Sequence, residues 1–198
     1  MYNNGMNVGI KQRLSNNEIA RKIFLSYPTD IFKDKLDIEF DIRNRISIKF
    51  DIPIISIQVS GSAKTGYSYH KDKNFELGVS DLDVSIINEK LFLQYMKIAY
   101  KTTNGYSDLS KFSSSKGLSG GEVQKSFIKY IGKGLLRPDL LPSCIEKDEW
   151  FKFFNGLSQD YFKLFKNINA GIYCNEFFFE YKQADVVRKY KKEGKSND

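Results

Sequence analysis

The sequence contains little cysteine and histidine. Its 198 residues include two cysteines, Cys144 and Cys174, and one histidine, His70. Zinc sites and disulfide frameworks need paired or clustered ligands, so this composition argues against both. We interpret the cysteines as small buried side chains.

Long apolar runs are also lacking. No stretch approaches the roughly 18 to 20 apolar residues that cross a bilayer, and the polar segment Met1–Arg13 lacks the apolar core of a signal peptide. We therefore expect a cytoplasmic protein with no membrane partner. Hydrophobic residues make up 41% of the chain, enough to bury the core of a single domain over residues 1–198.

Positive charge is in excess and part of it lies near the C-terminus. The net charge is +7, and residues 182–195 hold only two acids, Asp185 and Glu193. Such a segment can attract a polyphosphate or an RNA backbone, or it can be a solvated helix end. The basic residues are Lys182, Arg188, Lys189, Lys191, Lys192 and Lys195.

Hydrophobic periodicity predicts more helix than strand. Strands are expected at 52–60 and 79–87, and 170–174 could be a brief strand or a turn. A Ser/Gly-rich loop is expected at 103–121. Helices are expected at 16–26 with Asn16 or Asn17 as cap, at 31–50, at 88–100 with Asn88 as cap, and at 122–132, 146–168 and 175–192.

These elements predict an α/β (α+β) fold, a small mixed sheet flanked by helices. We place its core at residues 16–101 and a mainly helical part at 122–192. The later helices carry many aromatic residues, which could stack bases or pack in the core, and their helical spacing favours the core. They are Trp150, Phe151, Phe153, Phe154, Tyr161, Phe162 and Phe165.

A glycine-rich stretch, "GSAKTGYS" at 61–68, follows the first predicted strand. Gly61, Gly66 and Ser68 have the spacing of a Walker-type phosphate loop, but Tyr67 occupies the position of the phosphate-binding lysine. This departure argues against an ATPase-type loop. The turn at Gly61 and Ser62 can still offer backbone N–H groups and a hydroxyl to phosphate, because glycine allows close approach.

A pair of acids starts the second predicted strand, in "VSDLDVSII". Residues two apart on a strand face the same side, so Asp81 and Asp83 project together and can hold one or two Mg²⁺ (or Mn²⁺) ions. Paired divalent ions can clamp the attacking and leaving oxygens of a displacement at phosphorus. Lys64 lies near the proposed phosphates in sequence and is the candidate charge partner.

Together, "VSGSAKTGYS" and "SDLDVSII" resemble the motif of the nucleotidyltransferase superfamily, which has a polymerase-beta-like fold. The resemblance covers residues 52–87. It implies that Gly61 and Ser62 hold an NTP triphosphate and that Asp81 and Asp83 bind the magnesium (or manganese).

The same resemblance implies a third carboxylate from a later strand. The candidates are Asp108, Glu122 and Glu176, each of which also has a structural explanation: a turn residue for Asp108 and helix N-terminal charges for the two glutamates. Without a third acid, the chain would be a degenerate member that binds nucleotide without transferring it.

We therefore expect a nucleotidyltransferase that moves NMP from an NTP to an acceptor hydroxyl on RNA or tRNA, a protein or a small molecule. The resemblance makes a toxin or antiphage-defence role plausible. The alternative is a catalytically degenerate module that senses nucleotides or binds a partner protein. A third hypothesis is simple RNA binding through the basic C-terminal segment.

Overall fold

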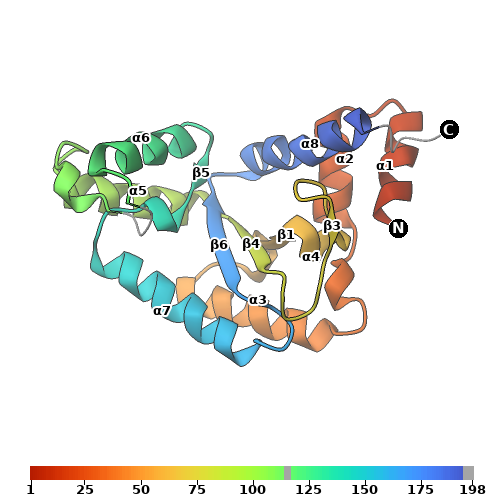
Figure 1. Ribbon diagram of the computed structural model, residues 1–198, viewed down its shortest axis with the longest axis horizontal. Coiled ribbons are helices and arrows are strands. Elements are labelled where there is room, and N and C mark those ends of the chain that lie inside the picture. Colours follow the sequence, from red (N-terminus) through yellow and green to blue (C-terminus); the bar gives the residue numbers. More distant parts are fainter. Residues whose placement is uncertain (114–116, 194–198) are drawn as a thin grey trace.

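The fold is built around a small mixed sheet with helices on either side. The computed structural model describes residues 1–113 and 117–193. The sheet has the order β1-β4-β6-β5 (Figure 1). Its strands are β1 (Ile57–Ser60), β4 (Leu82–Ile87), β5 (Leu135–Leu136) and β6 (Ile168–Tyr173).

Strand register determines which polar residues share a row across the sheet. β1 and β4 are antiparallel, with Ser60 opposite Asp83. β4 and β6 are parallel, with Asp83 opposite Asn169. Ser60, Asp83 and Asn169 therefore lie side by side on three neighbouring strands, which are about 4.8 Å apart. β5 pairs antiparallel with β6 only at Leu135 and Leu136, so it leaves residues 168–171 of β6 without a strand partner there.

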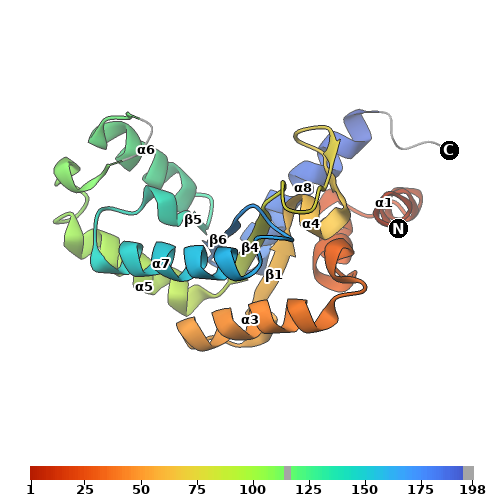
Figure 2. The same ribbon diagram turned by 60° about the horizontal axis from the view of Figure 1, so that its bottom comes forward.

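The main hydrophobic core joins the sheet to three long helices. It contains Ile57 and Val84 from the sheet together with Ile46, Phe92 and Trp150 from the helices. Figures 1 and 2 show these helices together on one side of the sheet. They are α3 (Leu36–Phe50), α5 (Glu89–Thr102) and α7 (Ile145–Asp160).

A second hydrophobic cluster joins the N-terminal helices to the last helix, α8 (Glu176–Lys192). Its buried residues include Met6, Phe24 and Phe179. Arg21 makes two hydrogen bonds to Glu180 across this junction, at 2.5 and 2.9 Å. The N-terminal elements are α1 (Tyr2–Lys11), α2 (Asn16–Arg21) and the π-helical turn η1 (Lys22–Ser26), which continues α2.

Short elements complete the chain. A hairpin of β2 (Tyr67–Ser68) and β3 (Lys73–Asn74) stands beside the main sheet (Figure 1). The others are η2 (Asp30–Phe32), η3 (Ile54–Ser56), α4 (Gly61–Thr65), η4 (Leu109–Lys111), α6 (Gly120–Ile131) and η5 (Pro138–Leu140).

The predicted fold class is confirmed, including a small mixed sheet flanked by helices and a mainly helical C-terminal half. Asn88 caps α5 as predicted, through a 2.8 Å bond from the Leu91 N–H. The expected brief strand at 170–174 is β6, an inner strand of the sheet. No described helix is long and apolar enough to cross a membrane.

Three predictions about individual elements were wrong. The cap of α2 is Ser15, not Asn16 or Asn17. The helix predicted at 146–168 ends at Asp160, because Ile168 already begins β6. The polar segment 1–13 contains the unpredicted helix α1, whose apolar face packs on α8 and η1.

Several other expectations were met only in part. Of the seven aromatic residues predicted to pack in the core, Trp150, Phe154 and Phe165 are buried, three are half-buried, and Phe162 is exposed. Both cysteines are partly exposed and unpaired. The predicted loop 103–121 includes residues 114–116, and the basic segment includes Lys195; these lie outside the described residues.

We predict that Ser15→Ala lowers the free energy of unfolding by about 1 kcal/mol. The Ser15 hydroxyl accepts the Glu18 N–H while the Glu18 carboxylate accepts the Ser15 N–H, and alanine loses the first of these bonds. Urea denaturation measures the change. Ser15→Asp keeps an acceptor at the cap and should retain most of the stability; equal losses in both variants would contradict the capping role.

Candidate functional site

A pocket of about 600 Å³ opens on the sheet. It extends from the end of β1 across β4 and β6 to the segment after β5 and to α7, while α8 forms another wall. Its polar and charged lining includes Ser60, Asp83, His70, Arg137, Asp139, Asn155, Asn169, Lys182 and Gln183.

Gly61 and Asp83 touch at one end of this pocket. A Cβ placed on Gly61 would collide with Oδ2 of Asp83 and lie 3.2 Å from its Cγ, so the carboxylate rests directly against the glycine backbone. Gly61 also has a φ of +65°, a conformation that L side chains rarely adopt. The two sequence motifs therefore meet in space at Gly61 and Asp83. The close contact with Asp83 and the positive φ each require glycine at position 61.

The pocket environment favours the protonated form of Asp83. Its side chain is accessible to water, but the concave walls replace much of the surrounding solvent. This desolvation, followed by the charge of Asp81, raises the pKa of Asp83 to about 6, and Lys71 acts in the opposite direction. A nearby cation would thus stabilise the ionised form of the two carboxylates.

The carboxylate oxygens of Asp81 and Asp83 suit a hard cation that takes its remaining ligands from water and substrate. In the part of the chain described, no three His, Cys, Asp or Glu side chains form a metal-binding group. Mg²⁺ often uses one or two protein carboxylates and completes its shell with water and substrate phosphate. Asp81 and Asp83 meet that minimum in number. However, Asp81 precedes β4 rather than lying on it as predicted, does not line the pocket, and accepts a 2.9 Å bond from Asn167 at its Oδ1.

The third-acid candidates all lie away from the pocket. Asp108 caps the turn η4 by accepting the Ser110 N–H, and Glu122 forms a capping box with Ser119 on α6. Glu176 is in the first turn of α8 and is exposed. The residue beside Asp83 on the neighbouring strand is Asn169, which lines the pocket with an amide.

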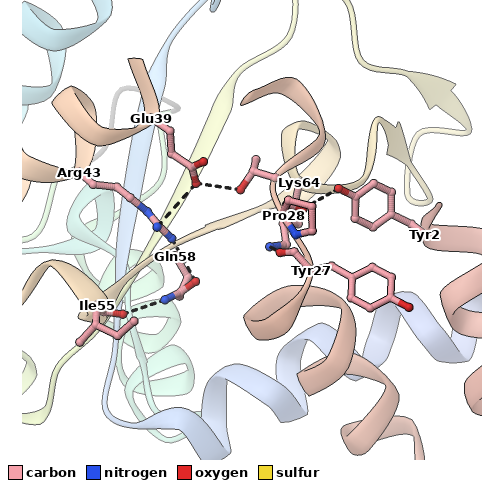
Figure 3. Close-up of polar contacts among 9 residues, drawn as sticks. Tyr2, Tyr27, Pro28, Glu39, Arg43, Ile55, Gln58 and Lys64 are labelled. Atoms are coloured by element: carbon pink, nitrogen blue, oxygen red, sulfur yellow. Dashed lines mark hydrogen bonds and ion pairs between the residues drawn. The ribbon is translucent and has the colours of Figure 1, made fainter. Parts of the chain in front are cut away.

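Ser62 and Lys64 do not line the pocket, although Gly61 does. Lys64 is buried, and its Nζ donates a 2.6 Å bond to the backbone oxygen of Tyr27 (Figure 3). Burial, then the charge of Arg43, lowers the pKa of Lys64 to about 8, while Glu39 acts the other way. The structure thus does not bring Lys64 to the site where we expected a charge partner.

Lys64 belongs to a polar cluster at the junction of α3, α4 and the segment after η1 (Figure 3). Arg43 contacts Glu39 at 3.7 Å and Gln58 at 3.2 Å. Glu39 also accepts a 3.0 Å bond from the hydroxyl of Thr29. These contacts tie the glycine turn to the N-terminal segment.

A different cation and a histidine face the pocket instead. Lys182 reaches it from α8, and His70 from the β2–β3 connection. Lys189 donates a 3.3 Å bond to the backbone oxygen of His70, which joins that connection to α8. The sequence offered His70 in a polar loop and Lys182 in a basic helix as possible phosphate contacts, but nothing in their spacing indicated a shared pocket.

Sequence reasoning also missed Arg137, Asp139 and Asn169. Arg137 and Asp139 form a two-bond ion pair, with distances of 3.1 and 2.6 Å. They lie in "RPDLLPS", which composition marks only as a connection. Asn169 reaches the pocket because of the register between β4 and β6, which the sequence does not reveal.

No family model, curated protein or solved structure matches this chain.

We predict that Gly61→Ala destabilises the fold by about 1–3 kcal/mol, the usual cost of a non-glycine residue in a strained conformation. The matched control is Gly117→Ala, since Gly117 has a φ of +69° and an added Cβ there would meet nothing within 4 Å. Thermal and urea unfolding should show the larger loss for Gly61→Ala, because only that variant also displaces Asp83. Equal losses would contradict the close contact.

We predict that Lys64→Met removes part of the rise in stability with pH. An unfolded lysine has a pKa near 10.4, and that of Lys64 in the fold is about 8. Between these pH values Lys64 is largely deprotonated in the folded state and still protonated in the unfolded state. The free energy of unfolding of the wild type therefore rises by up to about 3 kcal/mol as pH rises. Urea unfolding from pH 7.5 to 9.5 tests this against the exposed control Lys90→Met; parallel profiles for both variants would refute it.

Proposed function

We propose that this chain is a magnesium- or manganese-dependent nucleotidyltransferase that moves NMP from an NTP to an acceptor hydroxyl. The contact between the Gly61 backbone and the Asp83 carboxylate carries the proposal. It joins one residue from each motif of the resemblance at one pocket. The reaction would take place in the cytoplasm, and a toxin or antiphage-defence role is a biological context for it.

Asp81 and Asp83 would hold the metal. When bound, the ion would neutralise phosphate charge and orient the reacting oxygens. The raised pKa of Asp83 fits this role, because a cation would stabilise a carboxylate that has lost solvent and, to a smaller extent, is repelled by Asp81.

The chain's own residues would bind and orient the nucleotide. Gly61 leaves room for phosphate close to the backbone. Lys182 faces the same pocket and would supply positive charge that the buried Lys64 does not, and His70 would offer a hydrogen bond there. Ser62 follows Gly61 at the start of α4 and remains a candidate phosphate contact.

A second candidate function is nucleotide sensing without transfer, with a partner protein as its target. The neighbour of Asp83 on β6 is an amide, Asn169, and none of the three proposed acids reaches the pocket. A site with two carboxylates and no third acid could bind a metal–NTP complex and leave its phosphate bonds intact.

Asp83→Asn tests the proposal. With radiolabelled NTPs, Mg²⁺ or Mn²⁺, and cellular RNA, protein and small-molecule acceptors, we expect wild-type transfer to fall by at least about 100-fold in the variant, since even outer-shell metal partners cost 10–100-fold. The matched control is Asp37→Asn, an exposed acid on α3. Its transfer should equal that of the wild type.

Two other outcomes contradict transfer through this site. Undiminished transfer by Asp83→Asn would show that the carboxylate pair is not involved. Metal-dependent binding of a non-hydrolysable NTP that is lost in Asp83→Asn, with no label transferred to any acceptor by the wild type, would favour the sensor.

A further inference from the structure

The pocket continues well past the carboxylates. Because β5 pairs with β6 only at Tyr173 and Ile172, the pocket passes the edge of β6 at residues 168–171 and reaches α7. Arg137, Asp139, Phe151 and Asn155 line this far end. The proposed phosphate site at Gly61 is on the opposite side of Asp83, toward the other edge of the sheet.

Displacement at phosphorus is in line, so the attacking oxygen and the leaving group lie on opposite sides of the α-phosphorus. If the triphosphate lies at Gly61 and its α-phosphate near Asp83, the attacking oxygen must approach over β6. The far end of the pocket is therefore on the acceptor side.

We propose that this far end, which we call the β5–α7 site, binds a nucleoside that carries a free ribose hydroxyl. This inference rests on the proposed function, which sets the direction from which the acceptor oxygen approaches the α-phosphorus. The acceptor nucleoside could be the end of an RNA or a free nucleotide, and both present the same base and sugar.

The chemistry of the β5–α7 site suits a nucleoside. Phe151 is half-buried, packs against the main core and also lines the pocket, so a base can stack on the part of its ring that borders the pocket. Asp139 accepts hydrogen bonds, Arg137 donates them, and the Asn155 amide does both. Such groups can bind ribose hydroxyls and base edges.

Charge at the β5–α7 site argues against a polycationic acceptor. The one acid, Asp139, is already neutralised by Arg137, which is itself held over the Tyr130 ring at 4.8 Å. A polyamine or an aminoglycoside would need several unpaired acids. The neutral, partly aromatic wall favours a planar, neutral base.

The step balances without a further reactant. The ribose hydroxyl oxygen forms a bond to the α-phosphorus of the NTP, and the bond from that phosphorus to the bridging oxygen of the β-phosphate breaks. Pyrophosphate leaves on the Gly61 side, and the hydroxyl proton passes to water.

Equilibrium binding tests the β5–α7 site without relying on turnover. The full chain is saturated with a non-hydrolysable NTP and Mg²⁺, and a fluorescent decaribonucleotide or a fluorescent nucleoside monophosphate is titrated by anisotropy. We expect Asp139→Asn and Phe151→Ala each to weaken binding by about tenfold, which is within the range for losing one base stack or a specific polar contact.

Matched variants outside the pocket serve as controls. Asp160 pairs with Arg45 at 2.8 Å and is exposed much as Asp139 is, with side-chain exposures of 55% and 49%. Asp160→Asn and the exposed-ring variant Phe162→Ala should bind both probes as the wild type does. Asp139→Asn changes only a surface side chain, so it keeps the test valid if Phe151→Ala folds poorly.

The two probes identify the source of the nucleoside. A tenfold loss for the decaribonucleotide points to an RNA end, and a loss for the monophosphate points to a free nucleotide acceptor. Wild-type binding of neither probe, or unchanged binding by both pocket variants, overturns the inference.

Failure of the inference and failure of the proposed function are separable. If probe binding depends on Asp139 but no label is transferred, the proposed transfer fails and the β5–α7 site stands. If label is transferred to protein while probe binding is unchanged in the variants, transfer stands and the β5–α7 site does not bind the acceptor.

Discussion

The antiparallel register of β1 and β4 is the constraint on which the site depends. It sets Ser60 opposite Asp83, so that the residue after β1 must turn away beside a carboxylate. Only glycine fits, because its φ is +65° and a side chain would collide with Asp83. A shift by one residue would move Asp83 to the other face of the sheet, where the main core lies.

The rest of the fold holds this register and leaves one region of the sheet open. The helices α3, α5 and α7 bury the apolar face that includes Val59 and Val84. The helix α8 is fastened to the N-terminal helices through Arg21 and Glu180, and it contributes Gln183 and Lys182 to the pocket wall. Lys64 of α4 donates a hydrogen bond to the backbone of Tyr27, which joins the glycine turn to the segment after η1 and directs the lysine away from the pocket.

The sequence predicted those parts of the site that are close together along the chain. Gly61 follows β1 and Asp83 lies on its antiparallel partner β4, so the two local motifs sufficed to predict that these residues lie together. It could not predict the orientation of Lys64, because a side chain on a one-turn helix can face either phosphate or core. Nor could it predict Asn169 and Asp139, whose positions follow from the pairing of β6 with β4 and from the two-residue length of β5.

The two ends of the pocket differ in chemistry because different elements of the fold line them. On the β1 side the backbone of Gly61 lies against Asp83, and the proposed function assigns this side to the phosphates. The β6 side is bordered by side chains from α7 and from the segment after β5. These elements are distant in sequence from Gly61 and Asp83 and take no part in their contact. In the proposed function, acceptor specificity is therefore to be sought in Arg137, Asp139, Phe151 and Asn155, because these residues lie outside both sequence motifs and border the pocket beyond β6.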